Sequence, residues 1–195
     1  MNTHEQTEQF VPESINIPTA RKIHAELAKG CVINKEVYNV GTSQLVDNPL
    51  FTTLFKHYSY FKQTYALLGW ELVFRDAGNF FHVSRITDAD LDDADNSSIK
   101  VCIPLFVIAE HIVRLGQETA VLWNENLGVT QKDLDQIGSN DNSVHLLEAS
   151  SHKTVVDAIK HLKARNLVFE NSKGNIVFSS AAKYFVEQLI EKFAR

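Results

Sequence analysis

The feature that most constrains the fold is a pattern that occurs twice, about a hundred residues apart. In the first copy, apolar residues at helical spacing over 49–68 lead into two strand-like runs over 70–86 separated by a glycine turn. In the second copy, a helical pattern over 151–165 leads into a similar hairpin over 167–178. Apolar residues at i, i+3, i+4 and i+7 are typical of an amphipathic helix, and short runs around Gly and Asn are typical of a hairpin. The chain is therefore predicted to be α+β and mainly helical, with one small unit built twice.

Shorter helices and strands precede each copy, and this order predicts two tandem winged-helix domains, each with a small β-hairpin wing. Residues 1–18 are polar and acidic and include two prolines, so a flexible N-terminal tail is expected. The first domain then covers 19–86 and the second covers 99–195. Between them, 87–98 contains five Asp and no basic residue, which predicts a solvated acidic linker.

In the first domain, Thr19 is expected to cap a helix that precedes a short strand at 31–33. The stretch 34–48 has no clear periodicity and is assigned as a weak helix. Pro49 then stands at the first position of one long helix that continues to Leu68.

In the second domain, an apolar helix is expected over 102–122, with a short strand at 128–129. Thr130 and Asp133 have the spacing of a capping box, which predicts the start of a short helix. The polar stretch 138–150 is expected to be a loop, with at most a small helical turn.

Ser151 is then expected to cap the third helix of the second domain. The predicted buried stripe of that helix consists of Val155, Val156, Ile159 and Leu162. A final amphipathic helix is expected to begin at Ser179 or Ser180.

The sequence contains no motif of a catalytic or metal centre. Nucleophile elbows, phosphate-binding loops and dinucleotide-binding glycine patterns are absent, and the eight histidines show no zinc-ligand spacing. Cys31 and Cys102 are far apart in apolar surroundings and are expected to be reduced thiols. No cofactor is expected, and the chain is predicted not to be an enzyme.

A calcium loop is the functional alternative for the acidic stretch. Asp88, Asp90 and Asp92 occupy the first, third and fifth positions of such a loop. However, Asp93 replaces the required glycine and Ile99 replaces the closing glutamate, so the linker interpretation is preferred.

Basic side chains of the second domain are the candidate DNA contacts. They lie on the outer face of helix 151–165, at its end, or at the tip of the following hairpin: Lys153, Lys160, Lys163, Arg165 and Lys173. The net charge of −5 argues against a surface that grips nucleic acid everywhere. Since the set lacks the Asn, Gln or multiple Arg needed to read bases, any contact should be weak, salt-sensitive and sequence-independent. A solvated helix face explains the same lysines equally well.

The sequence shows neither a secretory signal nor a segment that could span a membrane. Residues 1–18 lack the basic and apolar regions of a secretory signal. The most apolar stretch, 101–113, is interrupted by Pro104, Glu110 and His111, so it is too short and too charged to span a bilayer. A cytoplasmic location is expected.

Several stretches carry a resemblance to a known family. Residues 48–51 (NPLF), 70–75 (WELVFR) and 78–83 (GNFFHV) resemble the first winged helix of the MukE/MksE accessory subunits of bacterial condensin-like complexes. Residues 127–134 (LGVTQKDL) and 175–179 (NIVFS) are similar to the second. The resemblance covers about 19–193. The chain is shorter than MukE and lacks its acidic C-terminal extension, which favours the MksE type or a related plasmid-defence subunit.

The resemblance implies a non-catalytic, nucleoid-associated subunit that acts in chromosome organisation or segregation. It implies a homodimer that binds a kleisin subunit (MukF/MksF-like) and, through it, an SMC ATPase. In the family, basic residues at the end of the second domain's third helix are implicated in weak DNA contact. Here the matching positions hold Lys163 and Ala164 in place of a basic pair, which implies a weaker contact.

Two other functions remain open from the residues themselves. A free-standing winged-helix transcriptional regulator would use the same helix to bind one operator sequence. An enzyme with a site that shows no recognisable motif is the third class.

Overall fold

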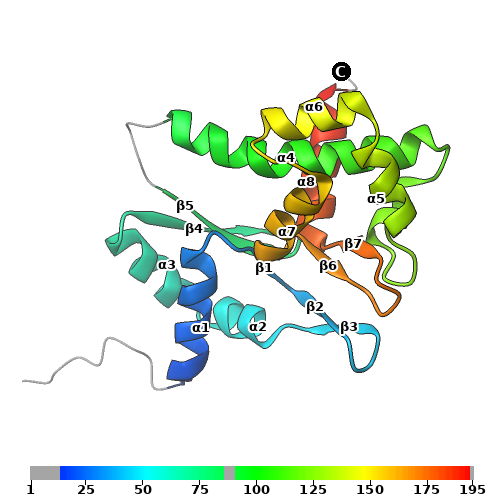
Figure 1. Cartoon of the computed structure of the whole chain (residues 1–195). Helices are drawn as coiled ribbons and strands as arrows, with labels where there is room; N and C mark the ends of the chain where they lie inside the picture. Colours follow the sequence, from blue (N-terminus) through cyan, green and yellow to red (C-terminus); the bar gives the residue numbers. More distant parts are fainter. Residues whose placement is uncertain (1–13, 86–90, 194–195) are drawn as a thin grey trace, which may run out of the picture.

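The computed structural model describes residues 14–85 and 91–193, and for 91–97 and 192–193 it describes the backbone alone. This part of the chain is α+β and mainly helical, with small antiparallel sheets (Figure 1). The predicted fold class is confirmed at this level. The tail expected over 1–18 falls mostly outside the described residues, as does 86–90 of the expected linker region.

The first half of the chain combines three helices with two small sheets. Its elements are α1 (Ile17–Ala28), β1 (Ile33–Asn34), β2 (Glu36–Asn39), β3 (Gln44–Asp47), α2 (Pro49–Lys56), α3 (Tyr58–Leu67), β4 (Trp70–Arg75) and β5 (Phe80–Arg85). Strands β1, β5 and β4 form one antiparallel sheet in that order, and β2 and β3 form a separate hairpin. In Figure 1, β4 and β5 run between the layer of α1–α3 and the long helix α4.

The second half is a helical layer closed by a small hairpin. Its elements are α4 (Leu91–Arg114), the 3-10 helix η1 (Thr119–Trp123), α5 (Gln131–Gly138), α6 (Asp141–Ala149), α7 (Val155–Ala164), β6 (Val168–Glu170), β7 (Ile176–Phe178) and α8 (Ser180–Phe193). β6 and β7 are antiparallel, and Val129 adds an isolated bridge to Ile176. Both predicted hairpins and the predicted final helix are therefore present.

The single helix expected over 49–68 is wrong, because the chain leaves helical geometry at His57 (φ −114°, ψ 30°). Just before this break, the Thr53 hydroxyl donates to the carbonyl of Pro49 at 2.9 Å, a bond typical of bent helices. Beyond it, the Tyr58 hydroxyl donates to the carbonyl of Leu72 at 3.2 Å. The break thus turns α3 so that its first residue packs on the sheet.

The weak helix expected over 34–48 is a β-hairpin. Val37 lies opposite Val46 and Tyr38 opposite Leu45 in the β2–β3 register. The turn is closed by the Asn39 side-chain oxygen, which accepts the backbone N–H groups of residues 41 and 42 at 2.9 and 3.3 Å. Such Asx turns offer the backbone an alternative to helix, and here the alternative wins.

Several element ends in the first half and the linker differ from expectation. Asn16, not Thr19, caps α1, and Ile15 is buried, so the end of the expected tail belongs to the fold. Helix α4 begins at Leu91, inside the stretch expected to be a linker, and ends at Arg114 rather than near 122. The stretch considered as an alternative calcium loop, which begins at Asp88, lies partly outside the described residues.

In the second half, the capping box of Thr130 and Asp133 is confirmed. The loop expected over 138–150 is wrong, since α6 is a nine-residue helix there. Thr154, not Ser151, caps α7, because its hydroxyl accepts the N–H of Asp157 at 3.1 Å.

The predicted buried stripe of α7 is wrong at one position. Val156 is 49% exposed, whereas Ala158 is buried, so the stripe consists of Val155, Ala158, Ile159 and Leu162. The buried residues are spaced i, i+3, i+4 and i+7 and so share one face of the helix, whereas Val156 lies about 100° round the helix from Val155.

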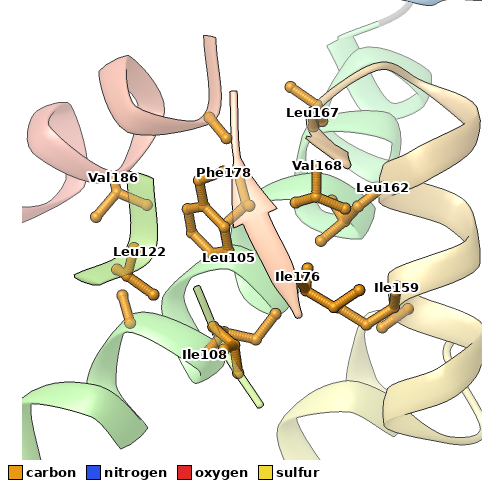
Figure 2. Close-up of a cluster of buried hydrophobic side chains, with 14 of the residues drawn as sticks. Leu105, Ile108, Leu122, Ile159, Leu162, Leu167, Val168, Ile176, Phe178 and Val186 are labelled. Carbon is orange, nitrogen blue, oxygen red and sulfur yellow. The ribbon is translucent and has the colours of Figure 1, made fainter. Parts of the chain in front are cut away.

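Buried apolar side chains fall into two clusters. One lies under α1–α3 and β4–β5 and includes Leu54, Phe61 and Phe81. The other lies between the helices and hairpin of the second half, where Phe178, Ile108 and Leu162 meet (Figure 2). Val32 and Phe80 of the first half belong to this second cluster.

Hydrogen bonds near Val32 also connect the two halves of the chain. The N–H of Val32 donates to the carbonyl of Arg165 at 3.0 Å, and the Asn166 amide donates to the carbonyl of Val32 at 3.0 Å. The Cys31 thiol donates to the carbonyl of Ala164 at 3.0 Å. Burial, with a smaller contribution from the charge of Glu26, raises the pKa of this thiol to about 11, so it is an unreactive structural group.

Candidate functional site

One candidate site is a groove of about 830 Å³ between the two halves. It lies among α1, the β2–β3 hairpin, β6 and the start of α8. We call it the interdomain groove, and define it by its main apolar lining residues Val37, Tyr38, Val40, Leu45, Trp123 and Phe169.

One wall of the interdomain groove is the β2–β3 hairpin, which pairs with no other strand of the described chain. Val37 is 40% exposed and Val40, beside the turn, is 71% exposed. Large apolar side chains at this exposure on an edge hairpin are a typical feature of a protein-binding surface.

The opposite wall comes from the second half of the chain. The rings of Tyr38 and Phe169 stack across the groove's end with centroids 5.0 Å apart. The Tyr38 hydroxyl also accepts the backbone N–H of Ser172 at 3.0 Å. Hydrogen bonding to Ser172, from its side chain first and its backbone N–H second, outweighs burial and lowers the pKa of Tyr38. The hairpin is therefore held against the second half at one end and leaves the groove open beyond it.

The base of the groove is fixed by Asn34. Its side-chain N–H donates to the carbonyl of Asn166 at 2.7 Å, and its side-chain oxygen accepts the N–H of Ala181 and the hydroxyl of Ser180, each at 3.2 Å. The residue is 5% exposed, so these bonds satisfy a buried amide that would otherwise be costly.

The charges around the groove are mixed, which decides what it can bind. Three lysines and three glutamates contribute to the lining: Lys22, Lys29, Lys183, Glu26, Glu36 and Glu170. Nucleic acid needs a surplus of positive charge, and this lining has none. Apolar walls with balanced charges at the edges suit a segment of another protein.

Three of the five predicted DNA-contact residues bond to other groups of the chain in the structure, and two are exposed. Lys163 forms an ion pair with Glu170 at 2.5 Å, and the Lys173 ammonium donates to the carbonyl of Asn126 at 3.0 Å. Arg165 is turned towards the first half, where one N–H group donates to the carbonyl of Gly30 at 3.3 Å. Lys153 and Lys160 are exposed. Three of the five cations are therefore bonded within the chain, and two are not assigned such a bond.

Two histidines of the second half, His152 and His161, pack against each other. His152 is buried beside His161, with ring centroids 5.1 Å apart, and its Nε2 lies 2.9 Å from the carbonyl of Lys100. Burial first, and then the charge of Arg165, lower the pKa of His161. In the described chain, no three His, Cys, Asp or Glu side chains gather in an arrangement that could hold a metal ion.

The interdomain groove was not predicted from the sequence. Its wall, the β2–β3 hairpin, lies in the stretch assigned as a weak helix. The signal that could have indicated it was a pair of apolar or aromatic residues on each side of a turn with Gly41: Val37 and Tyr38 before the turn, and Leu45 and Val46 after it.

The comparisons with known proteins bear on the whole chain. In the described residues, no helix has both the length and the apolar character needed to cross a membrane. A search of the curated proteins found no match. A family model described as condensin complex protein MksE matches residues 18–190. That span includes both helix-plus-hairpin units and both walls of the interdomain groove. The chain belongs to the MksE family of condensin complex proteins.

Proposed function

We propose that this chain is a non-catalytic accessory subunit of a bacterial condensin-like SMC complex and binds a kleisin partner through the interdomain groove. The family match over 18–190 is the observation that carries the assignment to such a complex. The complex would act in the cytoplasm, on the nucleoid, in chromosome organisation or segregation. A plasmid-defence role remains an alternative within the same class.

The arrangement of elements supports two winged-helix domains within this subunit. Each half ends a helical layer with an antiparallel hairpin, β4–β5 in the first and β6–β7 in the second. We propose domain limits at 19–86 and 99–195, with 87–98 as the acidic connection. Winged-helix domains serve as protein-binding and DNA-binding modules, and the apolar groove favours the protein-binding use here.

The chemistry of the complex is assigned to the partner. We propose that the SMC ATPase supplies nucleotide hydrolysis, because the sequence of this chain carries no phosphate-binding loop or other catalytic motif. A homodimer would present two copies of the groove.

DNA contact is a secondary part of the proposal. Lys153 and Lys160 are the candidates that remain available, since Lys163, Arg165 and Lys173 bond within the chain. Two free lysines support only weak, salt-sensitive binding without sequence preference.

The experiment is a binding titration with the kleisin encoded beside this chain, using the double variant Val37→Asp/Val40→Asp. Each added carboxylate would be buried against an apolar partner without a counter-charge, so affinity should fall by at least about tenfold. Val156→Asp is the matched control, because Val156 is also exposed but lies on α7 outside the groove lining. Circular dichroism checks that both variants are folded.

If the kleisin binds the double variant and the native chain with equal affinity, the interdomain groove is not its binding site. Failure of the native chain to bind any kleisin would remove the function itself. The transcriptional regulator is the second candidate, and tight binding to one operator that survives competitor DNA would support it instead.

A further inference from the structure

The interdomain groove runs along the free edge of strand β2. This strand pairs with β3 on one side and with no strand of the described chain on the other. Glu36, Val37 and Tyr38 all line the groove, whereas β3 contributes Leu45 alone. Because successive side chains of a strand point to opposite faces, a groove lined by three residues in a row borders the edge of that strand. The hairpin extends from the first half on the side of β6 and β7 (Figure 1).

The hairpin register shows which backbone groups of β2 point outwards. The N–H of Asn48 donates to the carbonyl of Lys35 at 2.8 Å, so these residues are a hydrogen-bonded pair that continues the β2–β3 register. Bonded and non-bonded pairs alternate along an antiparallel ladder. Val37 therefore bonds to β3, whereas Glu36 and Tyr38 direct their N–H and C=O groups away from it. Within the described residues, these outward backbone groups bond to no other part of the chain.

The free edge of β2 lacks the features that usually protect an edge strand. Natural edges are commonly blocked by Lys, by Pro, by a bulge or by a covering segment. The sequence of β2 is Glu-Val-Tyr-Asn, in which Glu36 is the one charged residue. The hairpin also exposes Val37, Val40 and Val46 to solvent. An unprotected edge beside exposed valines is suited to pairing with another polypeptide.

The two faces of the hairpin define where the side chains of an added strand would lie. Tyr38 and Leu45 are opposite each other in the register, so they share one face. Tyr38 stacks on Phe169, which shows that this face is turned towards the second half. Alternate side chains of a strand added beside β2 would lie on the same face, towards the groove residues Trp123 and Phe169. Those positions of the added strand should therefore be apolar.

Charges of the lining indicate the composition of the same segment. Glu36 on β2 and Lys22 on α1 are exposed and line the groove, and neither forms an ion pair among the described residues. The other charged lining residues have partners in the chain, in the pairs Lys29–Glu26, Glu170–Lys163 and Lys183–Glu187. A segment with one basic and one acidic side chain would complement the two unpaired charges.

We propose that the kleisin segment binds in the interdomain groove as an extended strand that pairs with the free edge of β2. The inference rests on the proposed function and adds the conformation and the sequence pattern of the bound segment. The backbone groups of Glu36 and Tyr38 supply the hydrogen bonds, and pockets for alternate side chains supply specificity. The segment has apolar residues at every second position, a basic residue beside Glu36, and no proline where an N–H group must donate to β2.

The first test is a backbone N-methyl scan of the bound segment. Overlapping synthetic peptides of the kleisin encoded beside this chain locate the segment by calorimetric titration against the full chain. Single N-methyl groups are then placed at each residue of the tightest peptide. Affinity should fall by about tenfold or more at every second residue, where the N–H group donates to β2, and should change little between them. A helical segment would lose affinity at successive residues, which would overturn the proposal.

The second test changes the edge of β2 in the full chain. Glu36→Pro removes one outward N–H group but no bond of the hairpin, and should weaken kleisin binding by about tenfold or more. Asp47→Pro is the matched control, because Asp47 has the equivalent outward position on β3 and lies outside the groove lining. Glu36→Gln keeps the N–H group and should cost less affinity than Glu36→Pro. Circular dichroism checks that all three variants are folded.

The outcomes separate this inference from the function on which it rests. If the kleisin binds the native chain and Glu36→Pro with equal affinity, strand pairing is wrong while kleisin binding stands. An equal loss in Glu36→Pro and Asp47→Pro would also overturn the pairing, since it would reflect the hairpin and not its groove edge. If no kleisin peptide and no intact kleisin binds the native chain, the proposed function and the strand both fail. The N-methyl scan uses the native chain, so it decides the question even if Glu36→Pro does not fold.

Discussion

At the scale of single residues, Asn34 joins the two halves by hydrogen bonds from one side chain. Its side chain bonds to residues 132 and 147 positions away in the sequence, and both bonds are shielded from water. A sequence cannot indicate such a role, because one Asn in a run of polar residues resembles any other. By contrast, the capping box of Thr130 and Asp133 was predictable, since its two members are three residues apart.

Replacement of this side chain tests its role. Asn34→Ala should lower the free energy of unfolding by about 2 kcal/mol, because the carbonyl of Asn166 and the N–H of Ala181 would lose their partners in a buried site. Urea denaturation followed by circular dichroism measures the change. Asn142→Ala, at an exposed position of α6, is the control and should be nearly neutral. Equal stability of the two variants would contradict the assignment.

At the scale of elements, the sequence predicted those whose signals are local. The hairpins β4–β5 and β6–β7 have apolar runs around a turn, and their bounds were predicted closely. The β2–β3 hairpin was missed because its valines are exposed to solvent and form no buried stripe. The division between α2 and α3 was missed because His57 breaks an apolar pattern that itself continues.

A test at this scale concerns the start of α5, which packs on α4, α6 and α7. Thr130→Ala removes the hydroxyl that accepts the N–H of Asp133 at 3.3 Å, and should destabilise the chain by about 1 kcal/mol. Thr130→Ser keeps the hydroxyl and should retain most of the stability. Urea midpoints compare them, and a loss of the same size in both variants would show that the methyl group, not the cap, matters.

At the scale of the whole molecule, the sequence indicated two similar units but not how they join. The expectation of a solvated linker implied independent domains. The structure instead places Val32 and Phe80 of the first half in the apolar cluster of the second. Phe80 also contacts Tyr184 and Phe185, with ring centroids 5.7 and 5.6 Å away. Contacts of this sequence separation leave no local pattern, so the way in which the two halves pack together could not be predicted from the sequence.

This union predicts a single cooperative unfolding transition. The chain contains two tryptophans, Trp70 in the first half and Trp123 in the second. In Trp123→Phe the fluorescence of Trp70 reports unfolding of the first half, and in Trp70→Phe the fluorescence of Trp123 reports unfolding of the second. The circular-dichroism midpoint of the same variant is the reference for each measurement. In each variant the fluorescence and circular-dichroism midpoints should coincide, because Val32 and Phe80 of the first half belong to the apolar cluster of the second. A fluorescence midpoint that departs from the circular-dichroism midpoint would show that the halves unfold independently.

The Tyr38–Phe169 stack also has a consequence for the timing of assembly. One wall of the interdomain groove is made from residues near 40 and the other from residues near 170, so the earlier wall has nothing to face while the chain is being synthesised. A partner cannot recognise the finished surface until β6 has emerged from the ribosome and docked. If the partner binds across both walls, as proposed, only a chain that has finished folding can enter the complex.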